Sequence, residues 1–483
     1  MAEYDFDIGV IGGGAAGLTV ASGAAQLGVK TVLVERGASL GGDCLHTGCV
    51  PSKTLIRTAE IYHDMRHAAR FGLPEVNVPP VDMGSVNGRI REVIEAIQEH
   101  DSEERFCGLG VKVVFGEARF VDEHMIDCSG KRLSARSWVL ATGSSPAVPP
   151  IDGLADVSYL TNEDLFSLEK LPSSLAIIGG GPIGCEMAQA FTRLGTTVTI
   201  VQRNSQLLPV EDEDMAEVVR AALAAEGVKV ELSAATTAVR RVNGEMEVEF
   251  ARTGRSHTVR AEQLLVAAGR MPRVEGLGLE NCGVELAGRG IKVDARLRTT
   301  QKHIFACGDV LGRYLFTHAA GYEGSIVLSN VVFHLPRKAD YTRLPWCTYT
   351  DPELASVGMN EKRALEAGVE YSVFEELFTN NDRARAEGRI EGKVKLILDH
   401  KEKPLGAQIV GPHAGELLGQ WATALGGGVK LSAMASMVMP YPTLGEINKR
   451  VAGRVLSPKL FSPMVRKTLS FLFDYKGRAC TLD

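Results

Sequence analysis

The sequence predicts an α/β protein, and three observations lead to that class. An apolar strand at residues 6–11 runs into a glycine-rich turn, a helix and a second strand. The same order of elements returns at residues 175–202. After about residue 340, several strands precede alanine- and glycine-rich helical stretches, which is typical of a separate α+β domain. A chain of 483 residues is also too long for one compact core.

In the first repeat the strand is followed by three glycines with the spacing G-x-G-x-x-G, namely Gly12, Gly14 and Gly17. Glycines at these positions let the backbone turn sharply and approach a pyrophosphate, which binds at the positive end of the following helix. The second strand ends at Glu35, where a carboxylate can accept a hydrogen bond from a ribose hydroxyl. The combination predicts a dinucleotide site.

The second repeat carries Gly179, Gly181 and Gly184 in the same spacing. Two dinucleotide sites in one chain imply two dinucleotides, and electron transfer between them indicates FAD and NAD(P). This repeat ends with Gln202 and Arg203 in place of an acid. Arg203 could bind the extra phosphate of NADP, whereas Gln202 could still bond a ribose. We therefore favour NADPH and leave NADH open.

Two shorter segments strengthen the flavin interpretation. Ala141, Thr142 and Gly143 follow one expected strand, and Asp309 comes just after another. Each segment alone carries little information.

The composition narrows the class of protein. A net charge of -6 gives no reason to expect a nucleic-acid partner. No apolar stretch approaches the roughly 20 residues of a membrane span, and the N-terminus shows no signal pattern, so we expect a cytoplasmic location. Most of the nine cysteines are scattered without a repeated spacing, which does not resemble a secreted disulfide framework.

Cys44 and Cys49 are the exception, because they form a tight local pair. Residues five positions apart differ by about 140° around a regular helix, so a distorted turn at Gly48 would be needed to bring the sulfurs together. A helix beginning near Cys49 would stabilise a thiolate, the form that exchanges disulfides. Lys53 lies four residues further on, and its positive charge would favour both a thiolate and a reduced flavin.

Two other interpretations of the pair remain. A structural disulfide is disfavoured in the cytoplasm, and a zinc site would need further ligands nearby. His46, between the cysteines, could bind a metal or lower a thiol pKa, although a role in the turn is the simpler interpretation. No resident metal site is predicted.

These motifs together resemble the class I pyridine-nucleotide:disulfide oxidoreductases, the family of dihydrolipoamide dehydrogenase, glutathione reductase and mercuric reductase. The resemblance runs from Gly12 through residues 350–353 (Thr-Asp-Pro-Glu) to the C-terminal region. It implies an enzyme with two Rossmann-like domains, one for FAD and one for NAD(P), and a C-terminal α+β dimerisation domain. It further implies that Cys49 faces the flavin and that Cys44 exchanges with the substrate.

The resemblance also implies cofactor roles for other residues. Lys53 would lie near the flavin with Glu186 as its partner, and Asp309 would bind the ribityl and phosphate part of FAD. The remaining implied cofactor contacts are Gly42, Gly269 and His318.

The resemblance implies a domain order and a homodimer. We expect an FAD-binding domain at residues 1–147, an NAD(P)-binding domain at 148–270, a second part of the FAD-binding domain at 271–340 and a dimerisation domain at 341–483. In such dimers the C-terminal domain of one subunit completes the active site of the other.

The sequence departs from the family at the expected catalytic base. Glutathione and lipoamide enzymes have a His-Pro-x-x-x-Glu segment, whereas this chain has Tyr441 in place of that histidine and keeps Glu446. A phenol with a pKa near 10 is a poor base at neutral pH. Mercuric reductase also has a tyrosine here, but Phe106 replaces its second tyrosine, Cys480 stands alone at the C-terminus, and no metal-capture domain precedes the first strand.

We therefore expect a mercuric-reductase-like enzyme that reduces a disulfide or a soft metal ion. The alternatives are a dihydrolipoamide dehydrogenase acting on a lipoyl protein, a flavin redox sensor and a membrane-associated quinone reductase. The last of these depends on residues 463–473, which mix a basic patch with an apolar cluster. Packing against the dimer partner is the favoured interpretation of this segment, and contact with a membrane surface is the alternative.

Overall fold

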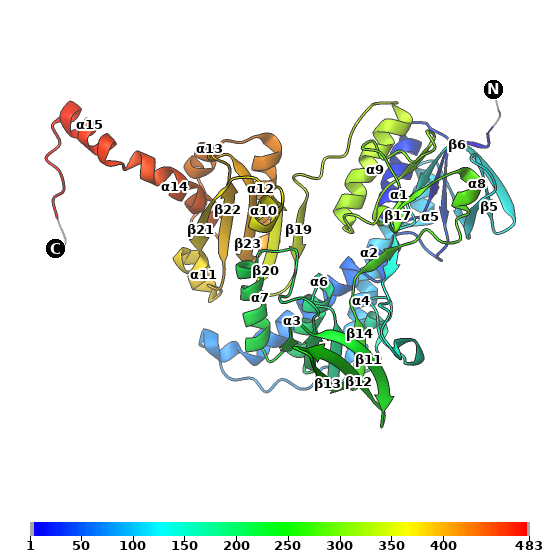
Figure 1. Ribbon diagram of the computed structural model, residues 1–483, viewed down its shortest axis with the longest axis horizontal. Helices are drawn as coiled ribbons and strands as arrows, with labels where there is room; N and C mark the ends of the chain where they lie inside the picture. Colours follow the sequence, from blue (N-terminus) through cyan, green and yellow to red (C-terminus); the bar gives the residue numbers. More distant parts are fainter. Residues whose placement is uncertain (1–3, 481–483) are drawn as a thin grey trace. The chain divides into compact units, whose positions relative to one another are not determined.

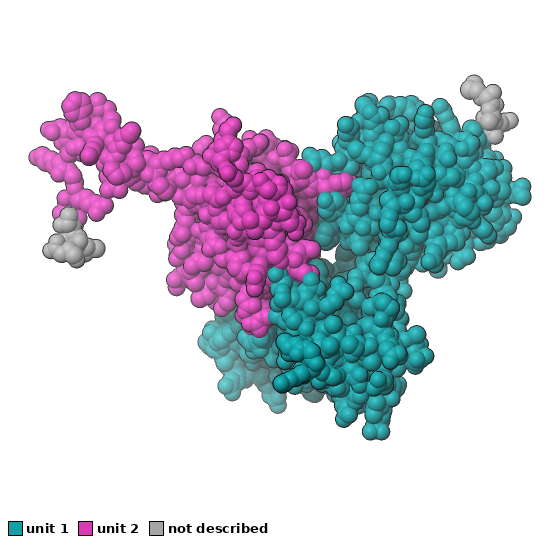
Figure 2. Space-filling model, viewed as in Figure 1, with its two compact units in different colours: residues 1–207, 223–340 teal, residues 208–222, 341–483 magenta. Residues whose placement is uncertain are grey.

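A computed structural model describes residues 4–480, which fall into two compact units (Figure 2). Unit 1 comprises residues 1–207 and 223–340, and unit 2 comprises residues 208–222 and 341–483. Figure 1 labels their helices and strands.

The largest sheet of unit 1 has seven strands in the order β3-β2-β1-β6-β5-β4, and β18 also pairs with β6. Its strands are β1 (Phe6–Ile11), β2 (Thr31–Glu35), β3 (Val111–Phe115), β4 (Ala118–Phe120), β5 (Met125–Cys128), β6 (Lys131–Leu140) and β18 (Ile304–Ala306). β3, β2, β1, β6 and β18 pair in parallel. Because the carboxyl ends of parallel strands share one edge of a sheet, the segments that follow β1, β2, β6 and β18 meet there.

Two helices that pack against each other share the hydrophobic core of this sheet. They are α1 (Ala15–Gln26) and α9 (Thr317–Val332), which lie side by side in Figure 1. The small side chains of Ala21 and Ala24 on α1 are buried in the same apolar core as Val327 on α9. Close packing of the two helices places their first residues in the part of unit 1 that contains the glycine turn.

A second parallel sheet in unit 1 has the order β10-β9-β8-β14. Its strands are β8 (Ser174–Ile178), β9 (Thr197–Val201), β10 (Lys229–Glu231) and β14 (Gln263–Val266), and α6 (Pro182–Leu194) connects β8 to β9. An antiparallel sheet follows, formed by β11 (Ala235–Val242), β12 (Glu245–Arg252) and β13 (Arg255–Ala261).

The two glycine turns are built alike. A Cβ on Gly17 would lie 1.9 Å from the carbonyl oxygen of Gly12, and a Cβ on Gly184 would lie 2.0 Å from that of Gly179. Only glycine fits where the helix approaches the preceding turn so closely. The predicted succession of strand, turn and helix is confirmed in both repeats.

The other elements of unit 1 connect these two sheets. The helices are α2 (Gly42–His46), α3 (Cys49–Arg66), α4 (Met83–Gln98), α5 (Glu103–Gly108) and α8 (Leu279–Cys282). The short sheets pair β7 (Ser144–Pro146) with β15 (Arg270–Pro272) and β16 (Leu286–Ala287) with β17 (Gly290–Ile291). α3 packs against both α4 and α6, so it links the two dinucleotide-type sheets.

Unit 2 is built on an antiparallel sheet in the order β19-β20-β23-β22-β21. The strands are β19 (Pro345–Thr348), β20 (Glu353–Gly358), β21 (Ser372–Leu377), β22 (Lys393–Leu398) and β23 (Pro404–Gly411). The helices are α10 (Glu361–Glu366), α11 (Asp382–Glu387), α12 (Ala414–Gly427), α13 (Leu431–Ser436), α14 (Glu446–Leu460) and α15 (Pro463–Phe473). Trp421 and Phe378 are fully buried in the core beside this sheet.

Segment 208–222 belongs to unit 2 and contains the start of α7 (Glu213–Ala225). Ion pairs connect this segment to the rest of the unit. The buried ammonium of Lys395 lies 2.5 Å from Asp214 and 2.7 Å from Glu361. Burial alone would lower the pKa of Lys395, but the hydrogen bonds to these carboxylates raise it above its usual value. Asp212, Asp214 and Glu361 lie close enough together to hold a cation, and the ammonium of Lys395 already contacts all three carboxylates.

The predicted α/β class is confirmed by the parallel sheets of unit 1, and the antiparallel sheet of unit 2 agrees with the predicted C-terminal α+β region. No helix within residues 4–480 combines the length and the apolar composition that a membrane span requires.

Candidate active site

Cys44 and Cys49 meet where one helix ends and the next begins. Cys44 lies in α2, and Cys49 is the first residue of α3. A Cβ on Gly48 would lie 2.8 Å from the carbonyl oxygen of Asp43 and 3.2 Å from the Cα of Cys44, so a glycine is needed at this break. The Cys44 thiol donates a hydrogen bond to the Cys49 sulfur.

The two thiols of this pair differ in acidity. The hydrogen bond from Cys44 lowers the pKa of Cys49 to about 6, against the effect of the protein packed around its sulfur. The Thr317 hydroxyl, 3.3 Å from that sulfur, and the charge of Lys53 lower it further. The same hydrogen bond, together with burial, raises the pKa of Cys44. At neutral pH the reduced pair therefore holds a thiolate at Cys49 and a thiol at Cys44.

The structure brings the predicted partners Lys53 and Glu186 together. The Lys53 ammonium and a Glu186 carboxylate oxygen are 2.8 Å apart, and the Glu186 side chain is 5% exposed. Lys53 lies one turn after Cys49 in α3, whereas Glu186 belongs to α6. This ion pair joins the helix of the cysteine pair to the helix that follows the second glycine turn.

Arg270, which the sequence motifs did not single out, joins the cysteine segment to Asp309. Its guanidinium lies 3.0 Å from Asp43 and 3.7 Å from Asp309. It donates to the Ser144 hydroxyl at 2.7 Å, and Ser144 in turn donates to Asp309 at 2.6 Å. Burial raises the pKa of Asp309, which Ser144 and Arg270 partly offset. Asn162 also donates to Asp43, so the residue before Cys44 is held from two sides.

The first glycine turn has the features that a dinucleotide requires. Gly14 precedes α1 and offers no side chain to cap it, which leaves the amides of the first helical turn available to a phosphate. The Glu35 carboxylate accepts hydrogen bonds from the amides of Gly13 and Gly37, each at 2.6 Å. These bonds hold the carboxylate beside the turn, where a ribose would lie. The turn and Glu35 therefore fit the ADP part of FAD.

The loop after β6 lies at the same edge of this sheet. Ala141 is buried, and the Thr142 hydroxyl donates to the carbonyl oxygen of Arg273 at 2.7 Å. The Gly143 carbonyl oxygen accepts a hydrogen bond from the Arg273 amide at 2.9 Å. These contacts and the nearby Asp309 fix the loop where the sequence predicted the flavin part of the cofactor.

The second glycine turn repeats this design with an amide in place of the acid. The buried Gln202 side chain accepts from the Gly180 amide at 3.0 Å and donates to the carbonyl oxygen of Gln206 at 3.2 Å. Gly181 precedes α6, again without a side-chain cap. Arg203 follows directly and is exposed. Gln202 thus shapes the turn, and Arg203 is available to a ligand.

Gly42, Gly269 and His318 lie in three different settings. A Cβ on Gly42 would lie 2.8 Å from the Cα of Gly14, so the cysteine segment packs directly on the first glycine turn. Gly269 has a positive φ of 114° and immediately precedes β15. His318 is exposed near the start of α9, with its ring stacked on Phe316.

His46 contacts the loop before α2 rather than the cysteines. Its Nε2 lies 2.9 Å from the carbonyl oxygen of Leu40 and 3.2 Å from the hydroxyl of Ser39. These contacts agree with a role in the turn.

The remaining predicted residues belong to unit 2. Tyr441 is 70% exposed, and its hydroxyl donates to an Asp382 carboxylate at 3.1 Å. This hydrogen bond raises the pKa of Tyr441. Glu446 is the first residue of α14, and its carboxylate lies 3.5 Å from the amide of Thr443. As a phenol with a raised pKa, Tyr441 cannot serve as a base at neutral pH.

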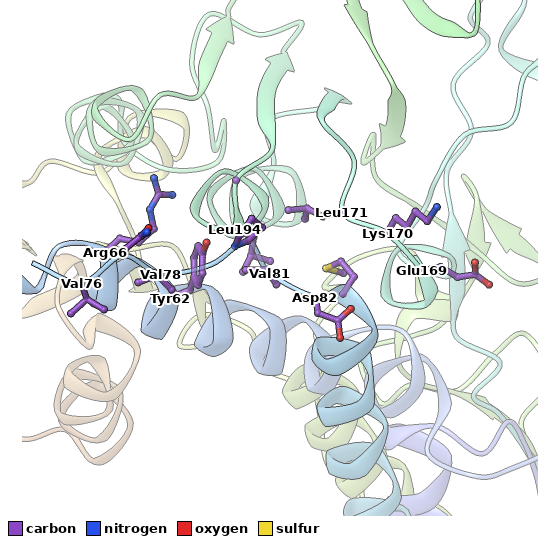
Figure 3. A pocket seen from close by; sticks show the side chains of 14 residues that line it. Tyr62, Arg66, Val76, Val78, Val81, Asp82, Glu169, Lys170, Leu171 and Leu194 are labelled. Atoms are coloured by element: carbon purple, nitrogen blue, oxygen red, sulfur yellow. The ribbon is translucent and has the colours of Figure 1, made fainter.

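A separate cleft of about 670 Å³ opens in unit 1 (Figure 3). Its lining comes from α3, residues 76–83, residues 169–171 and the end of α6. The Tyr62 hydroxyl donates to the carbonyl oxygen of Pro79 and holds one wall in place. Neither cysteine of the pair nor either glycine turn lines this cleft, so it is not part of the redox site.

We predict that replacing Thr317 by Val will raise the pKa of Cys49, because the variant loses a hydrogen bond to the thiolate. Alkylation requires the thiolate, so its rate rises with pH through the pKa. In the reduced protein we expect a midpoint near the value of about 6 for the native chain and a higher midpoint for Thr317→Val. The measurement is the rate of iodoacetamide labelling at Cys49 against pH, read by peptide mass spectrometry.

Thr317→Ser is the matched control, because it keeps the hydroxyl and should keep the native midpoint. An unchanged midpoint in Thr317→Val would contradict the assigned role of this hydrogen bond.

Comparison with known proteins places these features in a family. Residues 6–324 match the family described as pyridine nucleotide-disulphide oxidoreductase, and residues 344–452 match its dimerisation domain. A mercuric reductase of Streptomyces lividans is 34% identical over 459 residues, covering 94% of this chain and 96% of that enzyme. A dihydrolipoyl dehydrogenase of Bacillus subtilis is 34% identical over 446 residues, covering 91% and 96%.

A solved structure shares the same fold. The HOCl-induced flavoprotein disulfide reductase RclA of Escherichia coli has a TM-score of 0.84 and 28% identity, covering 93% of this chain and 100% of that chain. The match to the dimerisation domain supports a homodimer. The chain thus belongs to the pyridine nucleotide-disulphide oxidoreductase family, whose enzymes use FAD and NAD(P)H.

Proposed function

We propose that this enzyme transfers electrons from NADPH through FAD to a Cys44–Cys49 disulfide, and from there to a disulfide or a soft metal ion. The observation that carries the proposal is the division of the cysteine pair into a stabilised thiolate and a neutral thiol. Because the two thiols differ in pKa, the two sulfurs can take different roles, one beside the flavin and one toward the acceptor.

Bound FAD supplies the transfer of an electron pair from the nicotinamide to the disulfide. Reduction by that electron pair and one proton breaks the S–S bond and leaves a thiolate on Cys49 and a thiol on Cys44. The Cys44 thiol first gives its proton to the Cys49 thiolate, and the resulting Cys44 thiolate attacks an acceptor disulfide and releases one acceptor thiolate. That acceptor thiolate takes the proton from Cys49 and leaves as a thiol, which restores the thiolate on Cys49. Attack by the Cys49 thiolate on the mixed disulfide releases the second acceptor thiolate and restores the Cys44–Cys49 bond.

The surrounding residues stabilise the reduced form of the cysteine pair. Thr317 and Lys53 stabilise the Cys49 thiolate, and Glu186 holds Lys53 in place. We further propose that the glycine turns bind FAD and NADPH as the sequence predicted, with Glu35 on one ribose. The four-part domain division, and completion of each active site by the partner's C-terminal domain, belong to the same proposal.

The environment of Tyr441 favours a soft metal ion as the electron acceptor. An exposed phenol with a raised pKa cannot take the place of the histidine that lipoamide and glutathione enzymes use. Thiolates are preferred ligands of soft metal ions. A metal acceptor is further supported by relatives that are named mercuric reductases and by solved copper(II) complexes of RclA. We propose a cytoplasmic location, because most of the nine cysteines are scattered and do not form the framework of a secreted disulfide-rich protein.

Replacing Cys49 by Ser should abolish the long-wavelength absorbance band that a thiolate produces against the flavin. The Cys44→Ser variant should keep that band, because the sulfur that it removes is the one that meets the acceptor. Both variants should lose reduction of disulfides and mercuric ion. The measurement is anaerobic titration with NADPH, followed by steady-state turnover of each acceptor.

Cys107→Ser is the control, since Cys107 is an exposed thiol outside the pair. Survival of the band in Cys49→Ser would disprove the assignment of that sulfur. Turnover with disulfides, mercuric ion and quinones also tests the sensor interpretation, which predicts slow NADPH consumption with every acceptor.

Replacing Arg203 by Ala should raise the KM for NADPH about tenfold or more, because a charged hydrogen bond to the 2′-phosphate is lost. The KM for NADH should stay the same, since NADH lacks that phosphate. Arg255→Ala removes an exposed arginine on β13 and should change neither constant. If Arg203→Ala changes the KM for NADPH and the KM for NADH equally, Arg203 does not determine the preference for NADPH.

The lipoyl alternative is favoured by relatives that are named dihydrolipoyl dehydrogenases. Under our proposal the native enzyme oxidises dihydrolipoamide slowly. Replacing Tyr441 by His should then raise kcat about tenfold or more, because imidazole titrates near neutral pH and acts as a general base. Tyr441→Phe should leave the slow rate unchanged. Rapid native turnover that Tyr441→His does not improve would support the lipoyl alternative instead.

A further inference from the structure

The C-terminal helix α15 exposes apolar side chains along its length. It follows α14 at the end of unit 2 (Figure 1, red), and none of its residues is buried. The exposed fraction is 72% for Met464, 88% for Phe471 and 62% for Leu472. An exposed apolar cluster of this kind requires an explanation.

The side chains of α15 are separated into two arcs. At 100° per residue, six apolar side chains fall on one broad arc, which also holds Thr468. They are Met464, Val465, Leu469, Phe471, Leu472 and Phe473. The remaining arc holds Arg466, Lys467 and Ser470, together with Pro463 at the start of the helix. The helix is therefore amphipathic, with a cationic polar side.

The charges and aromatic rings of the tail differ from those of the chain as a whole. Residues 461–480 contain four cationic side chains against the single acid Asp474, whereas the whole chain has a net charge of -6. The cations are Arg466, Lys467, Lys476 and Arg478. Within residues 4–480 no ion pair joins any of these four to a carboxylate. Four aromatic residues lie in the same stretch, namely Phe461, Phe471, Phe473 and Tyr475.

We infer that α15 docks on an anionic lipid surface. A broad apolar arc beside cations is the pattern of a helix that lies in the plane of a membrane interface, and aromatic rings are favoured at that depth. Each lysine or arginine near an anionic surface adds to the attraction. The unpaired cations of the tail are complementary to such a surface.

Packing of α15 against a second copy of the chain accounts for fewer of its features than docking on a lipid surface does. The match to the dimerisation domain covers residues 344–452 and ends before α15 begins. Packing against a partner subunit would cover the apolar arc but gives no reason for the concentration of cations. The homodimer would present two such tails, so that modest binding by each becomes firmer binding by both. The inference goes beyond the proposed redox chemistry and does not depend on the acceptor.

The test is cosedimentation of the full-length, FAD-loaded enzyme with lipid vesicles. Vesicles of phosphatidylcholine alone are compared with vesicles that also contain phosphatidylglycerol. We expect binding to the anionic vesicles that weakens as salt is added. Arg466→Glu combined with Lys467→Glu should lower partitioning about tenfold or more. Phe471→Ser combined with Leu472→Ser should lower it similarly, because the apolar arc is interrupted.

The matched control is Lys131→Glu combined with Arg132→Glu, which reverses two adjacent exposed cations on β6 in unit 1. It should bind vesicles as the native enzyme does, and all variants should oxidise NADPH normally. Absence of vesicle binding, or equal binding to neutral vesicles, would overturn the inference. Normal vesicle binding by the Phe471→Ser, Leu472→Ser variant would also overturn it. If the native enzyme does not bind vesicles and this variant changes the molecular mass of the dimer in solution, the apolar arc packs against the partner subunit instead.

Discussion

The chemistry proposed for this enzyme depends on the hydrogen bond by which the Cys44 thiol lowers the pKa of Cys49. The bond exists because the helix is interrupted at Gly48, where a side chain would collide with the preceding turn. An uninterrupted helix would direct the two sulfurs to different sides. The interruption also makes Cys49 the first residue of α3, so the helix dipole, Thr317 and Lys53 all stabilise the same thiolate. One backbone feature therefore brings the sulfurs together and makes them chemically different.

A second constraint places this pair beside the expected cofactor. The parallel strands of the large sheet end at one edge, and the cysteine segment packs on that edge through the close contact of Gly42 with Gly14. Arg270 then ties Asp43, in the cysteine segment, to Asp309, which follows β18. The residues that would hold FAD and the residues that would receive its electrons are thus joined by direct contacts.

Local patterns in the sequence predict much of this arrangement but not all of it. Both glycine turns and the strands beside them follow from spacing and apolar runs, because their structure depends on neighbouring residues. The contact of Thr317 with Cys49 joins residues 268 positions apart, and no local pattern indicates it. Arg270 was missed for the same reason, although it lies beside the predicted Gly269. The hydrogen bond from Tyr441 to Asp382 likewise depends on how separate elements of unit 2 fold together.

The most direct test of this account is a crystal structure of the oxidised enzyme with FAD bound. The account predicts a disulfide between Cys44 and Cys49, with the Cys49 sulfur in contact with the isoalloxazine ring and the Cys44 sulfur turned away from it. Cysteines far from the ring, or a Cys44 sulfur nearer to the ring than that of Cys49, would contradict it.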